Sequence, residues 1–262
     1  MEYHYQTLKI DFIEEGILLL ALNRPQSMNA ISYELLTEML QFMDLVALDE
    51  RVRVIILKGE GEKGFCGGLD IKEEIAGERL KGPALYTWQS QLALMLQKMR
   101  NIPQPFIALI HGAAAGGGFS FALAADMRII SPDARFSAFY ANIGLGGADM
   151  GSSYFLPRLI GAGVAYDLLL TGRFMDAEEA MNLGFASACV PREELLHTAL
   201  EKARLIAGKD PLAVRLTKEA INQNLDSGGL EAAVHLENRN QVLLMLNRLV
   251  DGKPLLDIKK TP

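Results

Sequence analysis

Short apolar runs alternate with amphipathic segments through the first two-thirds of the chain. The runs are partly β-branched and are bounded by Gly, Pro or Asp, a pattern typical of buried strands. The segments between them carry apolar residues at helical spacing, which is typical of helices packed on a sheet. The pattern therefore predicts strands at residues 17–22, 52–57, 105–110 and 127–130.

Two of the amphipathic segments are long enough to be read in detail. The first follows Ser32, a favoured N-cap residue, and the second ends before Pro103, which cannot continue a helix. Stripes of Met and aromatic residues at this spacing are usually core, so Trp88 is assigned no cofactor role. The two predicted core stripes are Leu35, Leu36, Met39, Leu40 and Met43, and Leu85, Trp88, Leu92, Met95 and Met99.

The last part of the chain has a different pattern. Asp176 begins a capping box for a short helix that Gly184 closes. After Pro191 the pattern is nearly all helical, interrupted at residues 210–211 and 226–229. We therefore predict an α/β fold with a core at residues 1–199 and a helical region at residues 200–262.

Composition narrows the possible partners and the compartment. Half of the 262 residues are apolar and the net charge is −6, which argues against a nucleic acid or an anionic membrane as partner. The first residues do not resemble a secretory signal. Cys66 and Cys189 lack metal-ligand spacing, so we expect reduced thiols in a cytoplasmic protein without a metal site, with Cys66 as a packing residue.

Two glycine-rich turns carry the candidate chemistry. The sequence HGAAAGGGFS at residues 111–120 follows an apolar run and leads into a helix-prone segment, and FCGGLD at residues 65–70 also follows an apolar run. Glycines at the start of a helix expose backbone N–H groups that can hold negative charge. Two such turns could direct two N–H groups at one oxygen, which is what an oxyanion hole requires.

These motifs, in this order, resemble the crotonase (enoyl-CoA hydratase/isomerase) superfamily. The resemblance runs from about Leu18 to the end of the chain. It is carried by LNRPQSMNA at residues 22–30, FCGGLDIKE at 65–73, HGAAAGGGFS, and LPRLIGAGVAYDLLLTGRFMDAEEA, which begins at residue 156. It implies a spiral of ββα turns followed by C-terminal helices that pack in a homotrimer or a dimer of trimers. It also implies an acyl-CoA thioester as substrate, with coenzyme A carried by the substrate rather than held as a cofactor.

The resemblance also assigns residues. The two oxyanion N–H groups would be those of Leu69 and Gly117, and Lys72 matches a lysine that contacts CoA phosphate. Gly67 stands where the family has alanine. The residues expected to contact the CoA thioester are Arg24, Gly68, Leu69, Asp70, Ile71, Lys72 and Gly117.

The chain departs from the family at the catalytic acids. Hydratases of this family use two glutamates, and the corresponding positions here are Ser120 and Tyr140. Neither can act as a carboxylate base. Ser120 is either a small helix residue or a polar contact to substrate, and Tyr140 either a donor to a substrate oxygen or a wall of the acyl pocket.

A third position offers a carboxylate. The spacing around Asp149 resembles that of dienoyl-CoA isomerases and of the 4-chlorobenzoyl-CoA dehalogenase branch, in which an aspartate is an acid/base or a nucleophile. Asp149 is therefore the candidate acid/base, with a helix N-cap as the alternative. We expect an enzyme that hydrates or isomerises an enoyl-CoA. The alternatives are a catalytically silent acyl-CoA-binding protein and a thioester hydrolase or dehalogenase-like enzyme.

Overall fold

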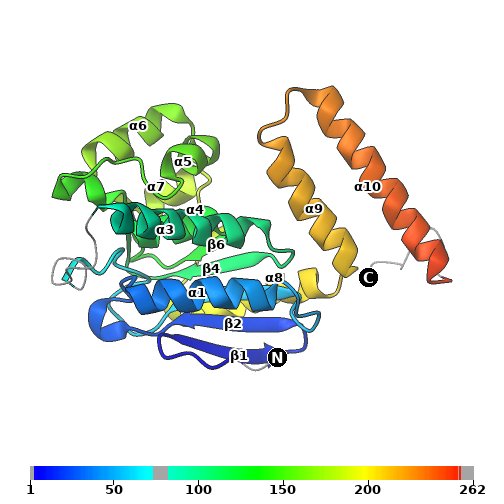
Figure 1. Cartoon of the computed structure of the whole chain (residues 1–262), viewed down its shortest axis with the longest axis horizontal. Coiled ribbons are helices and arrows are strands. Elements are labelled where there is room, and N and C mark those ends of the chain that lie inside the picture. Colours follow the sequence, from blue (N-terminus) through cyan, green and yellow to red (C-terminus); the bar gives the residue numbers. More distant parts are fainter. Residues whose placement is uncertain (1–2, 73–81, 253, 255–262) are drawn as a thin grey trace. The chain divides into compact units, whose positions relative to one another are not determined.

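The structure is a computed structural model that describes residues 3–72, 82–252 and 254 (Figure 1). It divides into two compact units, Met1–Ala207 and Gly208–Pro262. The boundary predicted at residues 199 and 200 falls inside helix α8 (Leu195–Ala207), a few residues before the point where the two units meet.

The first unit is built on a six-stranded sheet with the strand order β1-β2-β3-β4-β6-β9. Strands β1 and β2 pair in antiparallel fashion, and the remaining neighbours are parallel. The strands are β1 (Leu8–Glu14), β2 (Ile17–Leu22), β3 (Val54–Gly59), β4 (Phe106–Ile110), β6 (Met127–Ile130) and β9 (Ala188–Cys189).

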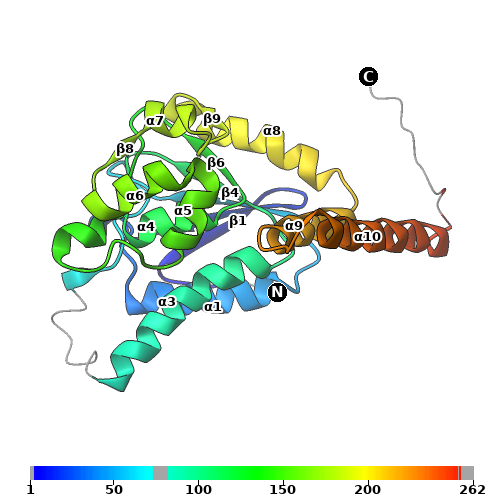
Figure 2. The ribbon, with the colours of Figure 1, turned by 90° about the horizontal axis from the view of Figure 1, so that it is seen from above.

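Helices cover both faces of this sheet, which explains why its inner strands β2 and β4 are apolar without alternation. One face packs Ile17, Ile56 and Ile107 against α8. The other face packs Leu18, Ile55 and neighbouring side chains against α1 (Tyr33–Val46), α3 (Pro83–Asn101) and α4 (Gly117–Ala124). Figure 2 shows α1 and α3 on one side of the strands and α8 on the other.

A second sheet gives the core its repeating character. It contains β5 (Ala113–Ala115), β7 (Arg135–Ser137) and β8 (Met175–Asp176). The chain alternates between the sheets, from β4 to β5 and from β6 to β7, and after β3 Cys66 bridges Ala114 of β5. Successive turns of the spiral thus contribute to both layers.

The structure confirms the four predicted strands with shifts of up to two residues. Strands β2 and β6 have the predicted bounds, and β3 begins at Val54 rather than Val52. The pattern did not predict β5, because three alanines beside glycines carry neither a period nor β-branched side chains.

The predicted helix signals are mostly confirmed. The Ser32 hydroxyl accepts the Leu35 N–H at 3.1 Å at the start of α1, and Asp210 caps α9 (Pro211–Asn224) in the same way. The stripe on α3 is wrong at its first position: Leu85 is 48% exposed, while Trp88 and the later members are buried. The first turns of the helix extend beyond the core, so Leu85 lines the open cavity instead of packing in the core.

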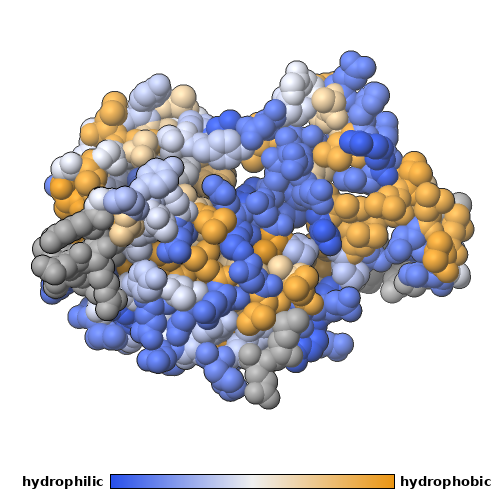
Figure 3. All heavy atoms as spheres, in the orientation of Figure 1, coloured by the Kyte–Doolittle hydropathy of each residue, from blue (hydrophilic) through white to orange (hydrophobic). Residues whose placement is uncertain are grey.

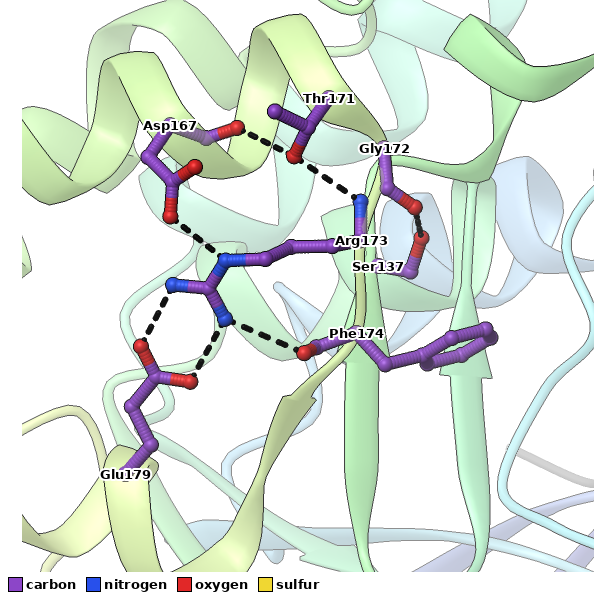
Figure 4. Close-up of polar contacts among 7 residues, drawn as sticks. All are labelled: Ser137, Asp167, Thr171, Gly172, Arg173, Phe174 and Glu179. Atoms are coloured by element: carbon purple, nitrogen blue, oxygen red, sulfur yellow. Dashed lines mark hydrogen bonds and ion pairs between the residues drawn. The ribbon is translucent and has the colours of Figure 1, made fainter.

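An arginine joins the elements around the capping box (Figure 4). Asp176 accepts the Glu179 N–H at 2.8 Å and so caps α7 (Ala177–Asn182), as predicted. In a capping box the Glu179 carboxylate would accept the Asp176 N–H. Here it accepts two hydrogen bonds from Arg173, whose Nε also donates to Asp167 on α6 (Ala162–Thr171). This network ties α6 to α7 around the short strand β8.

The second unit consists of α9 and α10 (Leu230–Val250). None of the residues of α10 is buried, and many of them are apolar, as the orange spheres along its C-terminal half in Figure 3 show. Among the helices that the structure describes, none is both long and apolar enough to cross a bilayer.

Candidate active site

The two glycine-rich turns lie side by side. Cys66 donates its N–H to the Ala113 carbonyl oxygen and accepts the Ala115 N–H, with N···O distances of 3.1 and 3.0 Å. This short parallel pairing carries residues 67–69 alongside 116–118. The sequence motifs, separated by about fifty residues, are therefore neighbours because the spiral stacks consecutive turns.

The backbones approach too closely for side chains. A Cβ built on Gly68 would lie 2.8 Å from the Ala115 carbonyl oxygen and 3.3 Å from the Gly117 nitrogen. Gly68 has a φ of +97°, which favours glycine. Within the described part of the chain, no acceptor is found for the N–H of Leu69 or of Gly117. Two N–H groups on adjoining turns are thus available to a ligand.

Helix α4 adds a positive end to this arrangement. Gly117 is its first residue, all eight of its residues are buried, and Gly116 before it has a φ of +51°. At the other end, the Arg128 guanidinium donates to the carbonyl oxygens of Ala122, Ala125 and Phe185. The cation and the helix dipole are aligned favourably. Burial lowers the pKa of Arg128 to about 10, so it stays protonated at neutral pH.

A cavity of about 700 Å³ opens beside the glycine turns, within the size range of small-molecule sites. Three segments line it: the glycine turns, the first part of α3, and the 3-10 helix η2 (Phe139–Ile143) with the loop that follows. The lining residues are Gly67, Gly68, Leu69, Ile71, Gly82, Leu85, Tyr86, Trp88, Gln89, Gly116, Phe139, Tyr140, Ile143, Leu145 and Asp149.

Asp149 brings a carboxylate to this mostly apolar cavity, and it is the one acidic residue among the described residues that line it. It is not the N-cap of α5 (Ser152–Ile160), because Gly151 occupies that position and no side chain caps the helix. Its Oδ1 accepts the amide of Gln89 at 2.6 Å and the N–H of Met150 at 2.7 Å. The helix-cap alternative is therefore wrong.

The residues at the two glutamate positions contact each other. The Ser120 hydroxyl lies 3.2 Å from the Tyr140 hydroxyl, and both side chains are buried. Burial raises the pKa of the Tyr140 phenol, so it remains a hydrogen-bond donor rather than a phenolate. Its hydroxyl also donates to the Asp149 carbonyl oxygen at 3.5 Å. Tyr140 lines the cavity, whereas Ser120 lies behind it.

The other predicted CoA contacts differ in whether they face the cavity, pair with protein groups or face solvent. Arg24 and Asp70 form an ion pair at 2.8 Å, and Arg24 also donates to the Ala30 carbonyl oxygen, so both side chains hold the loop together. Ile71 lines the cavity, and Lys72 is exposed beside it in sequence. Glu73, the last residue of the quoted loop motif, lies outside the described residues.

His111 and Cys66 have structural surroundings, and the packing role predicted for Cys66 agrees with its complete burial. His111 Nε2 lies 2.9 Å from the Gly61 carbonyl oxygen, and burial lowers the pKa of the ring. Cys66 is buried, its thiol donates to the Asn29 carbonyl oxygen, and burial raises its pKa to about 12. Among the described residues, no cluster of three or more His, Cys, Asp or Glu side chains could hold a metal ion.

Sequence reasoning missed the contribution of α3. Its residues Leu85, Tyr86, Trp88 and Gln89 form one wall of the cavity, although Trp88 was assigned only a packing role. The i, i+3, i+4 spacing shows that they share a face. The sequence contains no signal for the pairing of Gln89 with Asp149, because sixty residues separate them.

Comparison with known proteins identifies the family. Residues 12–247 match the family described as Enoyl-CoA hydratase/isomerase. A probable enoyl-CoA hydratase of Mycobacterium bovis is 38% identical over 234 residues, which cover 87% of this chain and 81% of that protein. A short-chain-enoyl-CoA hydratase of Clostridium acetobutylicum is 33% identical over 81% of this chain and 80% of its own length.

Solved structures agree with the sequence comparison. A probable enoyl-CoA hydratase/isomerase from Mycobacterium abscessus superposes with a TM-score of 0.85 at 35% identity, covering 95% of this chain and 97% of the other. A monofunctional enoyl-CoA isomerase from M. smegmatis gives 0.73 at 34% identity, covering 87% and 98%. The predicted spiral fold is thus confirmed, and the chain belongs to the enoyl-CoA hydratase/isomerase family of the crotonase superfamily.

Proposed function

We propose that this enzyme isomerises the double bond of an enoyl-CoA, with the thioester enolate held between the N–H groups of Leu69 and Gly117. The observation that carries the proposal is the single carboxylate, Asp149, on a cavity whose other described lining residues are uncharged. Moving a double bond requires one group that takes a proton from one carbon and returns it to another.

The proposed oxyanion hole rests on three observations. The two N–H groups belong to adjoining turns, and neither has an acceptor in the described part of the chain. The Gly117 N–H is also at the positive end of α4. Removal of a proton from the α-carbon places negative charge on the thioester oxygen, and fixed N–H donors stabilise that charge. One such donor contributes about a hundredfold to a thousandfold in rate.

The proposed reaction balances with Asp149 alone. The carboxylate takes a proton from the α-carbon of a 3-enoyl-CoA, and the resulting dienolate carries its charge on the thioester oxygen. The protonated Asp149 then returns the proton to the γ-carbon, which gives the conjugated 2-enoyl-CoA. The apolar lining excludes water and favours this transfer within the substrate over exchange with solvent.

Hydration is the second candidate. It requires a base that activates water and an acid that protonates the α-carbon, and the two usual positions here hold the hydroxyl groups of Ser120 and Tyr140. Asp149 would then have to serve in both roles. Some relatives are named as hydratases, such as that of Clostridium acetobutylicum, so the experiment below also measures hydration.

The test is a panel of thioesters assayed with the wild type and with Asp149→Asn. We expect the wild type to convert a 3-enoyl-CoA into the 2-enoyl-CoA, detected by the absorbance of the conjugated thioester, and Asp149→Asn to lose at least about a hundredfold in rate. Equal rates from the two proteins would remove Asp149 from the mechanism. Faster hydration of crotonyl-CoA than isomerisation would favour the second candidate.

Two further outcomes address the alternatives. Release of free CoA from an aroyl-CoA would indicate a hydrolase or a dehalogenase-like enzyme. Tight binding of butyryl-CoA by calorimetry, with no turnover across the panel, would indicate a silent binding protein. Exchange of the α-protons of butyryl-CoA in D₂O reports enolate formation directly, independently of which product forms.

Lys72 is the proposed contact to a CoA phosphate. It is exposed two residues after Asp70, whose carboxylate is already paired with Arg24. A lysine at this position can pair with phosphate as a point charge. We expect Lys72→Glu to raise KM for CoA thioesters and to change kcat little.

The proposed assembly is a homotrimer or a pair of trimers. It is supported by the apolar side chains that α10 leaves uncovered, of which Leu230 and Val250 are more than 80% exposed. Exposed apolar stretches of this extent are typical of contacts between subunits. Light scattering that gives the mass of a single chain would contradict this assembly.

A further inference from the structure

We infer that Gln89 is a positioning residue that orients the Asp149 carboxylate for proton transfer. The inference rests on the proposed function, because it concerns the group to which the acid/base role is assigned. It adds a residue of α3 that the sequence motifs of the family do not include.

The two oxygens of the Asp149 carboxylate differ in their hydrogen bonds. The Gln89 amide nitrogen lies 2.6 Å from Asp149 Oδ1, and the Met150 N–H lies 2.7 Å from the same oxygen. Within the described part of the chain, no donor is found for Oδ2. The two carboxylate oxygens are thus unequal: one is held by two donors and the other remains for substrate.

Gln89 and Asp149 are both attached to firmly packed backbone. Gln89 follows Trp88, which is 5% exposed, and Leu92 one turn later is fully buried. These anchors fix the rotation of α3 and therefore the direction in which Gln89 extends. On the other side, the Asp149 N–H donates to the Ser152 hydroxyl, and the Asp149 carbonyl oxygen accepts the Ser152 N–H. The carboxylate is held between two anchored elements.

The residue that follows Asp149 has a strained backbone. Met150 has a φ of +44°, in the left-handed region, which a residue with a side chain rarely adopts. This conformation accompanies the Met150 N–H bond to Oδ1 and places the Met150 side chain in the core. The strain is offset by the surrounding contacts, and strained backbone of this kind concentrates at functional sites.

The chemistry of the amide fits the role. Gln89 donates a hydrogen bond without carrying a charge, so it orients the ionised carboxylate but does not neutralise it. A lysine or arginine at this distance would form an ion pair with the carboxylate, which would stabilise its ionised form and make it a weaker base. A neutral donor therefore suits a carboxylate that must accept a proton and return it.

The experiment is a double-mutant cycle with Gln89→Leu and Asp149→Asn, using the thioester on which the wild type is most active. We expect Gln89→Leu to lower kcat about tenfold to a hundredfold with little change in KM, because a carboxylate displaced by about 1 Å transfers protons poorly. In the Asp149→Asn background, Gln89→Leu should have no further effect. Gln97→Leu, on the exposed side of the same helix, is the matched control and should behave as the wild type.

Two additional variants protect the test from a folding artefact. Gln89→Asn keeps an amide of shorter reach and should show the same loss of kcat without adding apolar surface. Gln89→Glu places a second carboxylate against Asp149, and the pair should share a proton. The acidic limb of its pH–rate profile should therefore move to higher pH by more than about one unit.

The outcomes separate the two claims. If Asp149→Asn retains full activity, or if no thioester is turned over, the proposed function fails and the inference fails with it. If Asp149→Asn loses most of its activity but Gln89→Leu is fully active, only the inference is overturned. The same holds if Gln89→Leu lowers the residual rate of Asp149→Asn by the same factor as it lowers the rate of the wild type. A change confined to KM would make Gln89 a substrate contact and would also overturn it.

Discussion

Gly118 packs directly against the carbonyl of Cys66, so that a Cβ at residue 118 would lie 2.1 Å from the carbonyl oxygen. Gly118 belongs to α4, which starts in the second glycine-rich turn, and Cys66 lies in the extended segment just before Gly67 and Gly68 of the first turn. The contact therefore holds the two turns together. Gly67, one residue after Cys66, is different: a Cβ there would meet its nearest neighbour, in Met28, at 3.5 Å, an ordinary contact.

The two glycines therefore make a matched pair for mutation. We expect Gly118→Ala to push the turns apart and to lower the free energy of unfolding by several kcal/mol, about the upper end of the range for overpacking. Gly67→Ala should fold normally and keep its activity. Urea denaturation and the thioester assay measure both effects. Equal stability of the two variants would mean that the turns are not held at this spacing.

Acid should destabilise the protein through His111. Burial, with the positive charge of Arg192 as a second cause, lowers the pKa of the folded imidazole. The unfolded chain therefore binds a proton below about pH 6.5 and the folded chain does not, so stability falls as the pH drops from that value toward the folded pKa.

The pH effect is measured by urea denaturation between about pH 7 and pH 5. The variant His111→Gln lacks the titrating ring. It should be less stable than the wild type at neutral pH, and the difference should shrink as the pH falls. A constant difference across the range would show that His111 does not titrate in this interval.

Arg128 should contribute far more to stability than an exposed arginine. Arg128→Met leaves three buried carbonyl oxygens without their donor, and each unpaired group costs about 1–3 kcal/mol. Arg204, whose guanidinium pairs with Glu14 at the surface, is the control. Arg204→Met should lower the stability much less than Arg128→Met does, because water screens a surface ion pair. Similar losses for the two variants, by denaturant titration, would contradict the capping role of Arg128.

The cysteines should differ sharply toward alkylating reagents. Cys189 is exposed, whereas Cys66 is fully buried and its thiol has a pKa of about 12. Thiolate is the reactive species, so iodoacetamide should label Cys189 in the folded protein and Cys66 only after unfolding. Peptide mass spectrometry distinguishes the two sites. Comparable labelling of both in the folded state would exclude Cys66 from the packed core.

The parts of the fold that sequence predicts are those that depend on local pattern. Strands β2 and β6, the N-cap at Ser32 and the breaks in the C-terminal helices follow from apolar runs, capping chemistry and residues that end helices. Strand β5 was missed because Ala113–Ala115 forms a strand only through its partners in the spiral. Tertiary context, rather than propensity, determines its conformation.

The candidate site divides in the same way. Motif order indicated that the turns containing Leu69 and Gly117 lie together, and the resemblance singled out Asp149, which lines the cavity. Neither could supply Gln89, whose partner lies sixty residues away on another element. The apolar face of α3 predicts core packing along its whole length, but its first part, at Leu85 and Trp88, lines the cavity. The spacing of apolar residues is the same in both parts, so only the three-dimensional structure distinguishes them.

The alternation of the chain between two sheets has a consequence for how chemistry can change in this scaffold. The backbone N–H groups come from equivalent points in consecutive turns of the spiral, so the stacking of the turns sets their spacing. The proposed acid/base group Asp149, its amide partner Gln89 and much of the apolar wall come from side chains on α3 and on the loop before α5. Substitution of those side chains can alter the chemistry of the cavity while the stacked turns keep the spacing of the two backbone N–H groups unchanged.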